Sequence, residues 1–142
     1  MRTAILTALA LSAIVSAGPA AAKVLHYTAK LNGASETPPN STTGSGSAKV
    51  DLDTTAKTVS WTVSYSGLTG PATAAHFHGP APVGQAAGVE VPLKGDLTSP
   101  IAGSASVSDA QAADLRAGQW YVNVHTAAHP AGEIRGQVVP VQ

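Results

Sequence analysis

The chain has no cysteine, few charged residues and no motif of a common enzyme class. Without Cys it has no thiolate metal ligands and no thiol chemistry, and a domain of this size can fold without disulfides. Charged residues make up 11%, which favours a compact β-domain rich in Thr, Ser and Gly. If residues 1–22 are removed, 8 − 1 = 7 basic residues remain against 8 acidic ones. This near-neutral balance attracts no phosphate backbone, and nucleic-acid binding is disfavoured.

Motifs of the common enzyme classes are also missing. The glycines at residues 44–46 do not lie between a strand and a helix, so they form no phosphate-binding loop. No Gly-x-Ser-x-Gly elbow occurs, and the scattered acidic residues do not suggest a paired-carboxylate hydrolase. The sequence leaves enzymatic activity undecided and favours a non-catalytic role.

Residues 1–22 have the pattern of a secretory signal peptide. Arg2 supplies a positive start, residues 4–15 an apolar core, and residues 20–22 a small-residue cleavage site. The apolar run is too short to span a membrane comfortably, and no longer one follows. We therefore predict one exported domain of 142 − 22 = 120 residues, secreted or periplasmic, with no membrane span after cleavage.

Alternating apolar residues predict an antiparallel β-fold. The alternation is clearest over residues 58–65, where Val59, Trp61 and Val63 alternate with hydroxyl residues. A capping box at residues 108–111 opens a short helix that ends near Ala117. Strands are expected over residues 24–31, 47–52, 58–65, 73–78, 89–93, 101–107, 120–125 and 134–141. Seven or eight short strands and one helix predict a β-sandwich or barrel.

Histidines provide the main functional signal. On an extended strand alternate side chains share a face, so His76 and His78 project together and Phe77 points to the opposite side. If the valines of residues 120–125 pack inward, His125 lies on the other face or at the rim. Three converging imidazoles suit copper or zinc, which both favour nitrogen donors.

Each polar candidate also has an ordinary explanation. His76 and His78 could simply alternate on a surface strand, and His129 is either a fourth ligand or an exposed loop residue. His26 is expected to lie on the surface or to support the ligands. Glu133 and Arg135 alternate and so face the same way, either to orient an imidazole or to form a structural ion pair or loop clamp. Glu36, in the first loop, is a further polar partner.

A series of motifs resembles one family over the length of residues 23–142. The motifs occupy residues 31–39, 67–68, 75–80, 118–126 and 130–137, and the first is similar to the pattern L-x-G-x-x-E-x-P-P. In this order they resemble the CHRD domain, a module named after chordin and found singly in many exported bacterial proteins. Together the motifs are highly specific, although no one of them would suffice.

The resemblance implies an immunoglobulin-like or superoxide-dismutase-like β-sandwich with Greek-key-like connections. It implies little about activity, because the family is largely without assigned function. Growth-factor inhibition, which is chordin's role, is not carried over, since chordin's cysteine-rich modules are missing here. The histidine pattern is loosely similar to the copper site of Cu/Zn superoxide dismutases. However, the chain has no disulfide and no recognisable ligands for a second ion, so dismutation is a minor hypothesis.

We therefore predict an exported CHRD domain that binds a transition metal, copper before zinc, through His76, His78 and His125, with His129 as a further candidate. The alternative is a structural or interaction module that binds no metal and whose partner is an exported protein. A copper-dependent redox enzyme is a minor alternative. The sequence predicts no oligomeric state.

Overall fold

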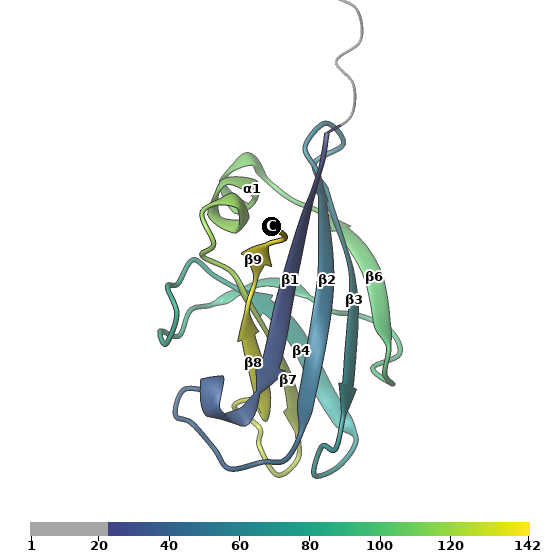
Figure 1. The fold of residues 1–142 in the computed structure, drawn as a ribbon. Coiled ribbons are helices and arrows are strands. Elements are labelled where there is room, and N and C mark those ends of the chain that lie inside the picture. The colour runs from purple at the N-terminus through teal and green to yellow at the C-terminus, as the bar shows by residue number, and fades with distance from the viewer. Residues whose placement is uncertain (1–22) are drawn as a thin grey trace, which may run out of the picture.

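The computed structural model describes residues 23–142, and the predicted signal peptide lies outside the described residues. Nine strands, one 3-10 turn (η1) and one α-helix make up this part of the chain (Figure 1). The predicted all-β fold with one short helix is confirmed. The elements are β1 (Val24–Asn32), η1 (Gly33–Ser35), β2 (Ser45–Asp53), β3 (Thr58–Ser66), β4 (Ala72–His78), β5 (Val89–Pro92), β6 (Ile101–Ser106), α1 (Asp109–Arg116), β7 (Tyr121–Thr126), β8 (Ile134–Gln137) and β9 (Val139–Pro140).

All strand pairs are antiparallel and form one sheet in the order β5-β4-β7-β8-β1-β2-β3-β6, with β9 also paired to β1. The sheet curls so that the β4, β7 and β8 part lies behind β1, β2 and β3, as in a sandwich (Figure 1). The Greek-key character of the connections stays a prediction. No helix in residues 23–142 has the length and apolarity needed to cross a membrane.

The core follows from the alternation in the strands. In β3 the side chains of Val59, Trp61 and Val63 are buried, and the hydroxyl residues between them face solvent. The rings of Trp61 and Trp120 each pack against Phe77, with ring centroids 5.6 Å apart in both pairs. Because Phe77 occupies the middle of this cluster, the core fixes the inner face of β4 and thereby the side chains on its outer face.

The elements at the end of the chain agree with the sequence signals except at the last strand. Ser108 and Gln111 form the predicted capping box at the start of α1, and Gly118 after its end has a φ of 71°. The single strand expected over residues 134–141 is instead divided at Val138. β8 pairs with β7 and, at Arg135, with β1, whereas β9 pairs with β1 alone.

Candidate metal centre

The pairing of β4, β7 and β8 arranges polar side chains in rows on the outer face of the sheet. Cross-strand pairing gives one row of His76, Asn123 and Arg135 and a second row of His78, Tyr121 and Gln137. Phe77, between the two histidines, points into the core and is fully buried. His125 lies two residues after Asn123, so the alternation of β7 places it on the same outer face.

Three of the predicted residues come together on this face. Each of His76, His78 and His125 offers a ligand atom within 4.8 Å of the other two. His76 Nδ1 lies 3.0 Å from His125 Nε2. No other group of three or more His, Asp or Glu side chains lies this close together within residues 23–142.

Backbone carbonyls fix the tautomers of two of these imidazoles. His78 Nδ1 lies 3.0 Å from the Ala87 carbonyl oxygen, and His125 Nδ1 lies 3.0 Å from the Pro130 carbonyl oxygen. A carbonyl oxygen only accepts hydrogen bonds, so both Nδ1 atoms carry the hydrogen. The Nε2 atoms of His78 and His125 are then left with lone pairs, and these atoms face the interior of the cluster.

Asn123 also belongs to the cluster. Its side chain is 3% exposed, and its Oδ1 lies 3.0 Å from His125 Nε2 and 3.1 Å from His78 Nε2. An amide oxygen and two deprotonated nitrogens repel one another, unless the amide turns its NH₂ group toward them or a cation lies between them. Asn123 was not among the predicted site residues, although its position on the His125 face of β7 could have identified it.

The surroundings favour the neutral form of two of these imidazoles, His76 and His125. Burial lowers the pKa of His76, and the neighbouring imidazoles of His125 and His78 lower it further. Burial also lowers the pKa of His125, against the opposing effect of the hydrogen bond to Pro130. A neutral imidazole is the form that binds metal ions.

The other two histidines lie outside this group. The backbone N–H of His129 donates to the Thr126 carbonyl, and its carbonyl accepts from Gly132 N, so His129 closes the turn after β7. That turn also contains Pro130, the partner of His125. His26 Nδ1 lies 2.6 Å from an Asp51 carboxylate oxygen in an exposed pair between β1 and β2.

Glu133 ties three chain segments together. Its side chain is fully buried and accepts hydrogen bonds from the hydroxyls of Thr42, Thr69 and Thr126 and from the Thr69 N–H, at distances of 2.5 to 2.9 Å. Burial alone would raise the pKa of Glu133, but these hydrogen bonds outweigh it and hold the pKa at about 2. The carboxylate therefore acts as a loop clamp, and it makes no hydrogen bond to a histidine within residues 23–142.

Arg135 contacts the site through a stack of rings. Its guanidinium carbon lies 3.5 Å from the centre of the Tyr121 ring, and that ring stacks on His78 at a centroid distance of 4.9 Å. The Tyr121 hydroxyl also contacts Ala87, whose carbonyl accepts from His78. Arg135 thus supports the ring that packs against a candidate ligand. It forms no ion pair with Glu133.

Glu36 and Asn123 both lie next to Gly132. Its side chain is 5% exposed, its Oε1 has no hydrogen-bond partner, and burial raises its pKa to about 7. A Cβ atom on Gly132 would collide with this carboxyl group and would lie 2.9 Å from Asn123 Nδ2. Glu36 and Asn123 therefore converge on the same small space, which only a glycine at position 132 leaves open.

These features define the class as an antiparallel β-domain with a three-histidine cluster on the outer face of its sheet. The family model of the CHRD domain matches residues 27–138, and the chain belongs to this family. The resemblance that the sequence motifs predicted is therefore confirmed, while the exported bacterial type stays a prediction. Comparison with curated proteins and with solved structures found no match.

Proposed function

We propose that this CHRD domain binds a transition-metal ion through His76, His78 and His125. The observation that carries the proposal is the convergence of three imidazoles whose ligand atoms lie within 4.8 Å of one another. Two of these imidazoles already have their Nδ1 hydrogens directed to backbone carbonyls. Metal-binding histidines in proteins commonly make this kind of hydrogen bond.

The spacing of the donor atoms fits a small ion. Metal–nitrogen bonds of ~2.0–2.1 Å place the donors of a trigonal or tetrahedral site about 3.3–3.6 Å apart. The His76 Nδ1 to His125 Nε2 distance of 3.0 Å is slightly shorter, and no pair of donors exceeds 4.8 Å. Small side-chain movements would therefore suffice, and Asn123 Oδ1 is close enough to act as an additional oxygen donor.

Copper is our first choice and zinc the second. A set of three neutral imidazoles without a thiolate suits both ions, and Cu²⁺ binds such sites more tightly than Zn²⁺. A bound ion would add a fixed positive charge beside Asn123. The residues of this chain would hold the ion, orient the imidazoles through Ala87 and Pro130, and exclude water on the Tyr121 side.

The test is a titration of untagged protein, residues 23–142, with Cu(II), Cu(I) and Zn(II). We expect about one equivalent to bind and the His78→Ala and His76→Ala/His78→Ala variants to lose most of the affinity. His26→Ala, which removes an exposed imidazole far from the cluster in the sheet order, is the matched control. Unchanged affinity in the His78→Ala variant would refute the assignment.

One observation favours the alternative, a structural or interaction module that binds no metal. Each of the three imidazoles already has a hydrogen-bond partner within the domain. This alternative predicts no tight metal binding and a lower melting temperature for metal-free His125→Ala. Redox catalysis, the third hypothesis, would require superoxide or peroxide turnover by the copper-loaded protein.

We also propose that the protein acts outside the cytoplasm. The proposal rests on the signal-peptide pattern of residues 1–22. N-terminal sequencing of protein recovered from the medium or periplasm should begin at Lys23. Recovery of the chain with residues 1–22 intact in the cytoplasm would contradict this localisation.

A further inference from the structure

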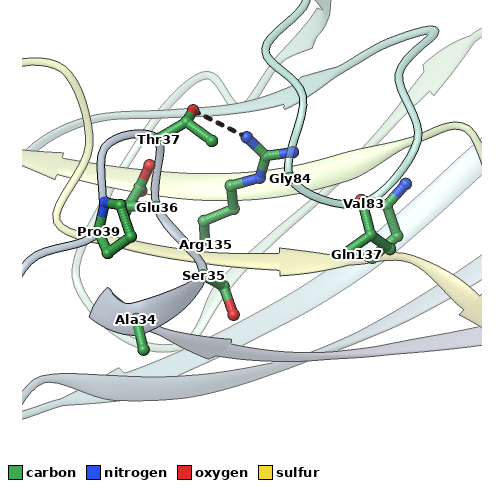
Figure 2. Close-up of a pocket in the computed structure, with 9 residues that line it drawn as sticks. All are labelled: Ala34, Ser35, Glu36, Thr37, Pro39, Val83, Gly84, Arg135 and Gln137. Carbon is green, nitrogen blue, oxygen red and sulfur yellow. Dashed lines mark hydrogen bonds between the residues drawn. The ribbon is translucent and has the colours of Figure 1, made fainter.

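A hollow of about 360 Å³ lies beside the histidine cluster, between the η1 loop and the loop that follows β4 (Figure 2). Its walls combine one guanidinium and one carboxyl group with small polar and apolar side chains. The lining residues are Ala34, Ser35, Glu36, Thr37, Pro39, Val83, Gly84, Arg135 and Gln137. The volume is in the range of sites for small organic molecules.

Arg135 is a buried cation without an anionic partner. Its side chain is 2% exposed, and the ion pairs within residues 23–142 are those of His26 with Asp51 and of Lys57 with Asp109. The guanidinium donates to the Thr37 hydroxyl at 3.1 Å and to the Gln85 carbonyl at 2.6 Å, and both acceptors are uncharged. Of its five N–H bonds, 5 − 2 = 3 have no partner in the described chain.

Glu36 forms no ion pair with this charge. The two side chains line the same hollow, yet no hydrogen bond or ion pair joins them. Burial raises the pKa of Glu36 to about 7 despite the opposing effect of Arg135, so a large fraction of molecules carry the uncharged carboxyl at neutral pH. The hollow therefore presents a fixed positive charge next to a weakly ionised carboxyl group.

We propose that this hollow binds a small organic carboxylate, with the carboxylate on Arg135 and a compact apolar body against Val83 and Pro39. A planar guanidinium held by two neutral acceptors is preorganised to pair with a carboxylate through two parallel hydrogen bonds. The stack on Tyr121 fixes the plane of the guanidinium.

The walls favour an organic carboxylate over an inorganic anion. Val83, at the rim, is 79% exposed, although it is a large apolar residue, and a bound apolar group would cover it. Ala34 and Pro39 extend the apolar wall on the opposite loop. Figure 2 shows Arg135 reaching between the two loops, with Thr37 on one side and Gly84 on the other.

The test is an NMR titration of metal-free protein with butyrate, with butyramide as the uncharged control and sulfate as the inorganic one. Butyrate should cause saturating shifts in the amides of residues 34–37, 83–85 and 135–137, and butyramide should cause none. N-acetylalanine resembles the C-terminus of a peptide, and comparing its affinity with that of butyrate shows whether a free acid or a chain end fits better. Saturation by either compound supports the proposal. Equal binding of butyramide, or sulfate binding as tight as that of butyrate, would overturn the proposal.

Two matched variants at the rim of the hollow test the role of charge without replacing the buried Arg135. Because Val83 is largely exposed, both Val83→Asp and Val83→Asn should fold. A negative charge at the rim should weaken butyrate binding by about threefold or more at low salt, whereas the neutral asparagine should not. Equal affinity in these two variants, or no saturation by butyrate or N-acetylalanine in the wild type, would also overturn the proposal.

Discussion

Replacing Glu36 with glutamine should remove a pH-dependent loss of stability. The carboxyl is 5% exposed and its Oε1 has no hydrogen-bond partner, and burial raises its pKa from 4.5 to about 7. Between these two values the folded protein binds more protons than the unfolded chain. Its free energy of unfolding must therefore fall as the pH rises through this window. The stability that the protonated Glu36 carboxyl contributes is fully present only below the unfolded pKa.

The magnitude follows from the size of the shift. A change of 7 − 4.5 = 2.5 units corresponds to a loss on the order of 3 kcal/mol once the pH exceeds the folded pKa. Glutamine has almost the same shape and carries no ionisable proton. The difference in unfolding free energy, Glu36→Gln minus wild type, should therefore increase by on the order of 3 kcal/mol between about pH 4 and pH 8.5.

Urea unfolding of metal-free protein at several pH values measures this difference, because the buried Trp61 and Trp120 provide a fluorescence signal. The change with pH is diagnostic, since a buried glutamine amide can shift the absolute stability in either direction. Glu90→Gln, at a half-buried position on β5, controls for the general loss of one carboxyl. A difference between Glu36→Gln and wild type that is the same at all pH values would refute the reasoning.

Three further predictions concern the clamp, the glycine and the metal. Thr126→Val removes one of the hydrogen bonds to Glu133 and should lower the free energy of unfolding by about 1–3 kcal/mol in urea at neutral pH, with Thr28→Val as the part-buried control. Gly132→Ala should lower the melting temperature by more than Gly84→Ala, because both glycines have a positive φ but only the Cβ at position 132 meets other side chains. Copper affinity should fall with falling pH, and the fall should begin at a lower pH than for a peptide with three freely exposed histidines, because the lowered pKa values of His76 and His125 delay competition by protons. A fall that begins at the same pH as in such a peptide, or at a higher pH, would contradict the last prediction when both are measured by competition with a chelator of known pH dependence.

The strands could be predicted from the sequence because their signal is local. Alternation fixes which side chains of β3 enter the core and places Phe77 opposite to His76, whatever the neighbouring strands are. The order of the strands has no such local signal. The division of the last strand at Val138 depends on where the chain leaves β7 while it stays beside β1, and β1 lies more than a hundred positions away in the sequence.

The site was predictable only in part, for a related reason. The alternation indicates that the three histidines share the outer face, but the tautomers of His78 and His125 depend on the carbonyls of Ala87 and Pro130, which come from irregular loops. The same holds for Arg135, whose partner Thr37 lies in the loop after η1 and whose partner Gln85 lies in the β4–β5 loop that also contains Ala87. Sheet residues thus supply the chemical groups, whereas loop backbone sets their protonation and orientation. Metal binding should therefore be sensitive to changes in these loops even where no ligand is replaced.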